Sequence, residues 1–223
     1  MKTGIFLSYR GLGANLLHLA YCHQIAKKFG PVSLITLCPN LGKALKDDPA
    51  FSEIIYLDKF HKKFFDLFKM SNFLKKFDFE NIFIFYPSLR HYLSSKFAGI
   101  KNIYHYPLFK KKNLHLVKAA KKFTEISLDI ENCPTETKFV INDLKAKQFK
   151  KSGLKKIILG ISSSGPTTKW GYLNYLSLIK KLNGLGEFYF YLLCGPDDQN
   201  EANQIIDQIN KKNCESLASK DIT

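Results

Sequence analysis

Residues 156–170 read KIILGISSSGPTTKW, an apolar run followed by a loop rich in small hydroxyl side chains. The run 156–161 predicts a β-strand, and the apolar spacing that follows predicts a helix over 171–182. A second apolar strand is expected over 188–194, and a helix over 201–210. Strands that alternate with helices in this way are typical of a parallel sheet covered by helices.

The N-terminal part of the sequence repeats this alternation. Apolar runs separated by turn residues and helical patterns lie at residues 4–7, 32–37, 53–57 and 81–86. One helix, with apolar residues from Leu16 to Ala26, follows the first run, and another is expected over residues 89–97. The pattern changes at Pro107 to basic helical segments with polar breaks, which indicates a linker that ends near Lys151.

We therefore predict an α/β protein with two Rossmann-like domains, residues 1–145 and 152–223. Only two strands are expected in the second domain. Two parallel strands with two helices are too few to protect a sheet edge or to fill a core. The second domain is thus expected to be incomplete, or to pack onto the sheet of the first.

The composition describes a soluble globular chain with a strong positive charge. Of 223 residues 45% are hydrophobic, and the formal net charge is +15, from 32 lysines but only Arg10 and Arg90. Readers of nucleic acid favour arginine, whose planar fork matches bases and phosphates, so we expect no nucleic-acid partner. Scattered Lys-Lys doublets indicate a solvated surface, with attraction to an anionic membrane as the alternative. No run is long enough for a membrane span or a signal peptide, so we expect a cytoplasmic protein.

The five cysteines are an odd number and form no C-x-x-C pair. This pattern favours reduced, buried thiols over disulfides or a zinc site. We expect neither a metal nor a cofactor. His18 and His23 are five residues apart, which is not the spacing of a metal-binding pair on a helix, so a structural role is favoured for both.

Two loops that follow strands are candidate binding sites. The first contains Gly11, Gly13 and Asn15, where glycines allow a helix N-terminus to approach an anion or a sugar hydroxyl. The absence of the third glycine of the dinucleotide fingerprint, replaced by Leu16, argues against a dinucleotide site. A plain tight turn between strand and helix is the alternative interpretation.

The second loop offers hydroxyl and N–H donors and one positive charge to phosphate oxygens. We predict phosphate binding by a set of five residues, Ser163, Ser164, Thr167, Thr168 and Lys169. The loop lacks the spacing of an ATPase P-loop. A polar loop that only caps the next helix is the alternative.

These segments carry a resemblance to a known family. The strand, the Ser/Gly loop, Lys169-Trp170, the turn 195–198 and Glu201-Ala202 are similar to the start of the C-terminal domain of heptosyltransferases, glycosyltransferase family nine. Gly11-Leu12-Gly13 resembles the family's G-x-G-D loop. The resemblance implies the GT-B fold and transfer of heptose from ADP-heptose to the lipopolysaccharide core at the inner face of the membrane. It also implies that Thr167, Thr168 and Lys169 contact the donor's phosphates.

The sequence departs from the family's pattern at important positions. Ala14 replaces the aspartate that the family uses as general base, and the neutral amide of Asn15 cannot take its place. Gly171 replaces a common proline, and the family's D-S-G-x-x-H segment is expected beyond Thr223. We therefore predict a glycosyltransferase-like protein that transfers heptose or another sugar from a nucleotide-diphosphate sugar to lipopolysaccharide or a cell-surface glycan. The alternative is an inactive or truncated homologue that still binds sugar or phosphate.

A further segment, residues 59–77, interleaves phenylalanines with lysines. Its spacing favours a helix that packs the aromatic rings into the core. The alternative is a helix that rests on an anionic membrane, which would give the protein peripheral contact with the inner leaflet. The pairs Asp47-Asp48 and Asp197-Asp198 are interpreted as helix caps.

Overall fold

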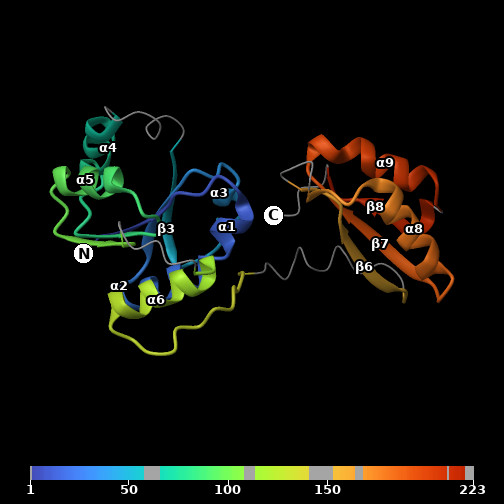
Figure 1. The fold of residues 1–223 in the computed structure, drawn as a ribbon, viewed down its shortest axis with the longest axis horizontal. Coiled ribbons are helices and arrows are strands. Elements are labelled where there is room, and N and C mark those ends of the chain that lie inside the picture. Colours follow the sequence, from blue (N-terminus) through green and yellow to red (C-terminus); the bar gives the residue numbers. More distant parts are fainter. Residues whose placement is uncertain are drawn as a thin grey trace. The chain divides into compact units, whose positions relative to one another are not determined.

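A computed structural model describes the chain at residues 2–57, 66–107, 114–140, 153–163, 168–209 and 211–218. It divides into two compact units, Met1–Val140 and Ile141–Thr223, which we call unit 1 and unit 2 (Figure 1). Each unit has its own parallel sheet and its own hydrophobic core. The fold class predicted from the sequence is confirmed.

The sheet of unit 1 has its first strand at the centre. Its five strands pair in parallel in the order β3-β2-β1-β4-β5. Every residue of β1 is buried, as expected for a central strand with both faces covered. The strands are β1 (Thr3–Leu7), β2 (Val32–Thr36), β3 (Phe51–Tyr56), β4 (Asn81–Ile84) and β5 (Asn102–His105).

Helices cover both faces of this sheet (Figure 1). On one face, Leu34 and Phe85 of the sheet region pack with α2 and α6 through Tyr21 and Phe123. On the other face, Ile35 and its neighbours pack against α4, and α5 lies beside α4. The helices are α1 (Leu12–Leu16), α2 (Leu19–Phe29), α3 (Leu41–Ala44), α4 (Asp66–Lys75), α5 (Leu89–Phe97) and α6 (Leu116–Leu128).

Unit 2 has a smaller parallel sheet in the order β6-β7-β8. Its core joins Leu159 and Phe190 of the sheet to Ile179 of α8 and Ile205 of α9. The elements are β6 (Lys155–Gly160), α8 (Tyr172–Asn183), β7 (Phe188–Leu193), the 3-10 turn η3 (Pro196–Asp198), α9 (Gln199–Asp207), a second 3-10 turn η4 (Lys211–Asn213) and β8 (Cys214–Ser216).

Three details differ from the sequence-based predictions. Unit 2 has a third strand, β8, which the sequence hides because its residues Cys-Glu-Ser form no apolar run. The half-exposed strand β5 was missed for the same reason. The first helix is two helices, α1 and α2, because the chain turns at Leu17-His18 and the His18 ring bonds to the Ala14 carbonyl at 2.7 Å.

Other predictions can be judged directly. All five cysteines are free in the structure, and every one except Cys194 is buried. Across the described ranges no group of three or more His, Cys, Asp or Glu side chains could hold a metal ion. No helix among these ranges has the length and apolarity to cross a membrane. Asp48 caps no helix; it accepts a bond from the Ala50 amide and pairs with His23 at 2.8 Å.

Candidate functional site

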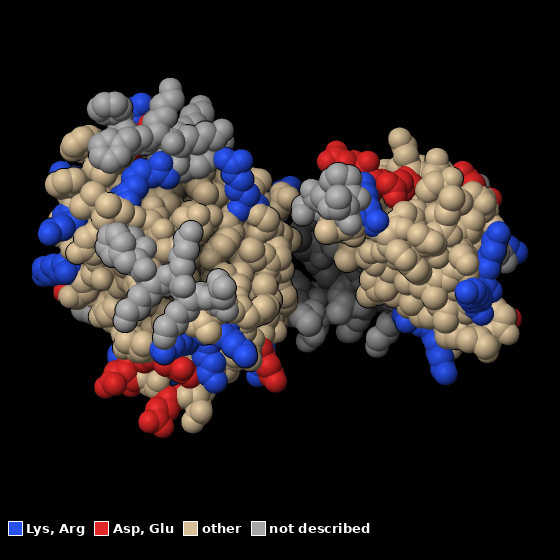
Figure 2. Space-filling model, in the orientation of Figure 1, with Lys and Arg blue, Asp and Glu red and all other residues tan. Residues whose placement is uncertain are grey.

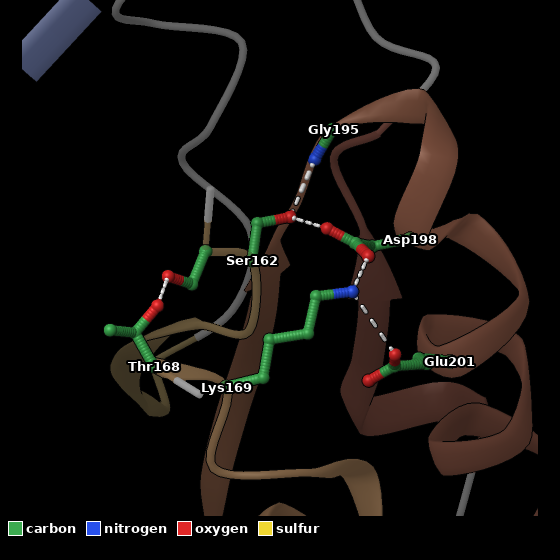
Figure 3. Close-up of polar contacts among 7 residues, drawn as sticks. Ser162, Thr168, Lys169, Gly195, Asp198 and Glu201 are labelled. Atoms are coloured by element: carbon green, nitrogen blue, oxygen red, sulfur yellow. Dashed lines mark hydrogen bonds and ion pairs between the residues drawn. The ribbon is translucent and has the colours of Figure 1, made fainter. Parts of the chain in front are cut away.

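A cluster of hydrogen-bonded polar side chains lies at the carboxyl ends of β6 and β7 in unit 2 (Figure 3). In a parallel sheet these ends meet at one edge, where ligands of α/β proteins bind. Ser162 follows β6 and Gly195 follows β7, so two loops far apart in sequence come together. We call the set Ser162, Lys169, Gly195, Asp198 and Glu201 the edge cluster.

Ser162 fastens the two loops to each other. Its Oγ accepts a hydrogen bond from the Gly195 backbone N–H at 2.9 Å and donates to Oδ2 of Asp198 at 2.5 Å. Asp198 is buried and ends the η3 turn just before α9. Asp198 occupies the N-cap position of α9, in line with its interpretation as a helix cap, but its side chain makes no cap bond to that helix.

Lys169 reaches across the cluster to both carboxylates. Its Nζ donates to Oδ1 of Asp198, and Oε1 of Glu201 lies 3.4 Å from the same nitrogen (Figure 3). Asp198 comes from the η3 turn and Glu201 from the first turn of α9. The lysine predicted to bind phosphate is thus held by two carboxylates in this structure.

The bonds of the edge cluster shift the proton affinities of its members in opposite directions. Bonding to the Asp198 side chain, and less strongly to Glu201, raises the pKa of Lys169. The bonds donated by Lys169 and Ser162 lower the pKa of Asp198. Both groups are therefore charged at neutral pH, and the three charged side chains carry a formal sum of −1.

The rest of the loop is held by local contacts. The hydroxyls of Ser163 and Thr168 are hydrogen-bonded to each other, so the structure brings these two predicted residues together. Tyr175 of α8 donates to the Gly160 carbonyl at 2.7 Å, and its ring meets the half-exposed Trp170 edge-on. Ser164 and Thr167, also predicted to bind phosphate, lie outside the described residues.

Gly171, which ends the loop, has a φ of +87°. A proline ring fixes φ near −65°, so proline is incompatible with this backbone. Gly171 therefore allows an entry into α8 that a proline at this position could not adopt.

The glycine loop of unit 1 is built differently: it ends at Gly11, the N-cap residue of α1, and Gly13 and Asn15 lie within this short helix. Asn15 is only 1% exposed, and its amide donates to the carbonyls of Gly11 at 2.7 Å and Tyr9 at 3.0 Å. Its side-chain oxygen accepts a bond from Thr36 at 3.2 Å. The side chain of Asn15 is thus occupied in bracing the loop. A Cβ on Gly11 or Gly13 would meet no atom within 4 Å, so the outer side of the loop is open.

Sequence reasoning missed the contributions of Ser162, Asp198 and Glu201 to the site. Asp198 lies 29 residues from Lys169, and Glu201 lies 32 residues away. The available signal was the acidic pair in the turn directly after β7. At the carboxyl edge of a parallel strand, an acidic side chain can face the loop of the neighbouring strand.

Comparison with known proteins places the fold among glycosyltransferases of the GT-B type. Within that class the chain resembles the heptosyltransferases. It superimposes on ADP-heptose lipopolysaccharide heptosyltransferase II of E. coli with a TM-score of 0.67 and 18% identity, over 99% of this chain and 73% of that chain. For a family 9 glycosyl transferase of Veillonella parvula the TM-score is 0.74, with 13% identity over 98% and 69% of the two chains.

A third structure is similar: E. coli heptosyltransferase WaaC with ADP-2-deoxy-2-fluoro heptose, with a TM-score of 0.67 and 13% identity over 97% of this chain and 76% of that chain. UDP-GlcNAc 2-epimerase of Methanocaldococcus jannaschii follows at 0.51 and 12%, over 98% and 73%. At these identities the likeness establishes the fold alone, and the epimerase shows that this fold also serves another reaction. No family profile and no curated protein sequence matches the chain.

Proposed function

We propose that the chain binds a nucleotide-diphosphate sugar through unit 2 and transfers heptose or another sugar to lipopolysaccharide or another cell-surface glycan. The observation that carries the proposal is the mixed chemistry of the edge cluster. An ammonium group, a hydroxyl and two carboxylates meet at the carboxyl edge of a parallel sheet. The similarity in fold to proteins described with ADP and with an ADP-sugar supports this choice of ligand.

The diphosphate and the sugar of such a ligand find matching groups in this cluster and in the adjoining loop. Diphosphate oxygens accept hydrogen bonds from an ammonium group, which Lys169 of the cluster supplies, and from hydroxyls, which Ser163 and Thr168 of the adjoining loop supply. Sugar hydroxyls donate hydrogen bonds, and the carboxylates of Asp198 and Glu201 accept them. A site made only of lysines would fit a simple anion equally well, whereas this one fits an anion joined to a polyol.

Binding requires Lys169 to exchange a carboxylate for a phosphate. The lysine is part-exposed, and ion pairs that reach solvent are weak and easily replaced. During transfer the acceptor oxygen forms a bond to the anomeric carbon while the bond from that carbon to the diphosphate oxygen breaks, and negative charge grows on the leaving group. The ammonium group of Lys169 is then placed to offset that charge.

A second candidate function is binding without turnover. Transfer requires a base to remove the proton of the acceptor hydroxyl, and the loop of unit 1 has Ala14 at the family's aspartate position. The neighbouring Asn15 is neutral, and its side chain is already bonded within the protein. This observation favours a module that holds a sugar nucleotide but does not transfer the sugar.

Calorimetry with ADP, UDP and GDP sugars at low ionic strength tests the proposal. Removing one charge-assisted bond in Lys169→Ala should weaken binding of the preferred nucleotide sugar about tenfold or more. The matched control is Lys180→Ala, an exposed lysine on α8, which should leave the affinity unchanged.

The outcomes separate the candidates. Absence of binding to every nucleotide sugar would refute the donor site, and equal affinities of Lys169→Ala and wild type would refute the role of the lysine. Binding with release of the free nucleotide in the presence of a lipopolysaccharide acceptor supports transfer. Binding without any release supports the inactive module.

The acceptor side is part of the same proposal. Gly11, Gly13 and Asn15 form the loop of unit 1 that we assign to the neighbourhood of the acceptor, with Asn15 supporting the loop from inside. We further propose a cytoplasmic protein in peripheral contact with the membrane, because a lipid-linked acceptor is held there.

A further inference from the structure

The pair of helices α4 and α5 presents aromatic rings to solvent. Phe68 of α4 is 59% exposed and Phe97 of α5 is 51% exposed, and the two rings stack with their centres 5.9 Å apart. Leu89, which lies on the same face of α5 as Phe97, is also exposed. Large apolar side chains that gather on a surface mark a contact site.

The other sides of both helices are buried in the protein. Leu67, Met70 and Leu74 of α4 are buried, as are Ser94 and Ser95 of α5. Packing of the core therefore does not need the exposed rings. The predicted phenylalanine-rich helix is confirmed from Asp66 onward, but one of its rings faces away from the core; residues 58–65 lie outside the described part.

The exposed charged side chains next to the aromatic pair are positive. Each ring has an exposed lysine next to it in the sequence, Lys69 beside Phe68 and Lys96 beside Phe97. The only acidic residue within either helix is Asp66, which is buried. On the face shown in Figure 2, lysine and arginine lie over the side of unit 1 that holds α4 and α5, whereas acidic groups gather near the segment after α6.

We infer that Phe68, Leu89 and Phe97, flanked by Lys69 and Lys96, form a docking surface for an anionic lipid bilayer. Aromatic and leucine side chains enter the boundary between headgroups and acyl chains, and lysines reach the anionic headgroups. A bilayer selects for this combination of apolar area and positive charge without requiring a shaped groove. The inference rests on the proposed lipid-linked acceptor and names the surface that reaches it.

Vesicle flotation without nucleotide tests the surface. The full chain should float with phosphatidylcholine vesicles that contain phosphatidylglycerol, and far less with phosphatidylcholine alone. The double variant Phe68→Ser/Phe97→Ser should lower the partition coefficient about tenfold or more. Lys69→Gln/Lys96→Gln should lower it about fivefold for each lysine.

Matched variants keep the test specific. Ile126→Ser removes another exposed apolar side chain of unit 1, on α6, and Lys118→Gln/Lys122→Gln removes two exposed lysines of the same helix. These controls should bind vesicles like wild type. Phe68→Leu/Phe97→Leu keeps the surface apolar and should retain most of the binding, and circular dichroism verifies the fold of each variant.

Several results would overturn the inference. One is failure of the wild-type chain to float on anionic vesicles, and another is equal flotation on neutral vesicles. A third is a loss of vesicle binding in Ile126→Ser as large as the loss in Phe68→Ser/Phe97→Ser. Loss of a dimer in size-exclusion chromatography of the Phe→Ser variant would instead assign the surface to a second copy. Because the nucleotide affinity is measured in solution, failure of vesicle binding leaves the donor-site proposal intact, and the reverse also holds.

Discussion

The two units use the same strand–loop–helix opening with opposite chemistry in the loop. After β1, the loop is braced by the buried neutral side chain of Asn15, bonded to two carbonyls and a hydroxyl. After β6, the loop is held by Ser162 and Lys169 through bonds to the carboxylate of Asp198, and the lysine is part-exposed. One loop is fixed by a buried neutral side chain, and the other is fixed by an ion pair whose lysine reaches solvent.

This difference indicates how each loop can serve binding. Hydrogen bonds of a buried side-chain amide are costly to break, because no water molecule takes the place of the lost partner. Charged bonds near solvent are exchanged for ligand atoms at little cost. The loop of unit 1 is therefore a rigid support, whereas the loop of unit 2 can trade internal partners for those of a ligand. This contrast supports the proposal that unit 2 binds the nucleotide sugar.

The largest expected effect comes from removing the brace of unit 1. Asn15→Ala removes a buried amide and leaves the carbonyls of Tyr9 and Gly11 and the buried Thr36 hydroxyl without their partner, which should cost about 2–4 kcal/mol in the free energy of unfolding. Urea unfolding can follow the units separately, because the single tryptophan, Trp170, lies in unit 2. Circular dichroism should show an early transition while the Trp170 fluorescence transition stays in place.

The control for this variant is Asn174→Ala in unit 2. Asn174 also bonds a loop carbonyl, that of Trp170, but it is exposed. Water can replace its bond, so we expect a change below about 0.5 kcal/mol. Equal destabilisation by the two variants would contradict the contrast between a buried brace and an exposed one.

The second largest effect is expected from a substitution that destabilises unit 2 instead of unit 1. Gly171→Pro places the family's common residue where φ is +87°, a backbone conformation that proline cannot adopt. We expect a loss of about 1–3 kcal/mol, typical of strained backbone. The transition followed by Trp170 fluorescence should now move to lower urea. An unchanged transition would show that the entry to α8 adapts freely to the substituted residue.

How much of the fold the sequence predicts depends on the length of the apolar runs. Residues 81–86 and 188–194 are long apolar runs, and each contains a strand in the structure. The strands β5 and β8 are short, and their place at the sheet is decided by tertiary pairing with β4 and β7. Local propensity carries little information about such strands.

The site is predictable only in its local half. The hydroxyls and Lys169 share one loop with an unusual composition, so the sequence indicates a polar site there. The carboxylates of Asp198 and Glu201 come from the next strand–helix unit, and their approach to Lys169 depends on the parallel pairing of β6 with β7. No spacing rule within a single segment reveals a partner of that kind.

The smallest expected effect concerns pH and separates a charged brace from a neutral one. Lys169 and Ser162 lower the pKa of Asp198 below its ordinary value of 3.8, so the carboxylate stabilises unit 2 above that value and loses this contribution as pH falls through the folded-state pKa. The pKa of Lys169 is raised, mainly by bonding to Asp198, so its contribution is complete below its ordinary 10.5 and disappears only as pH rises through the higher folded-state value. The ion pair is therefore intact through neutral pH, and nucleotide binding should not depend on its titration there.

A carbon-13 NMR titration of the Asp198 carboxyl measures this effect. In wild type the midpoint should lie below 3.8, and in Lys169→Ala it should move up toward 3.8, because the first donor to the carboxylate is lost. The hydrogen bonds of Asn15 involve no titrating group, so the carbon-13 signal of its side-chain amide should not change over the same pH range. A wild-type midpoint at or above 3.8 would show that Lys169 does not rest on Asp198 in solution. The lysine would then be available to phosphate without exchange, and the contrast between the two loops would shift from exchangeable bonds to an open site.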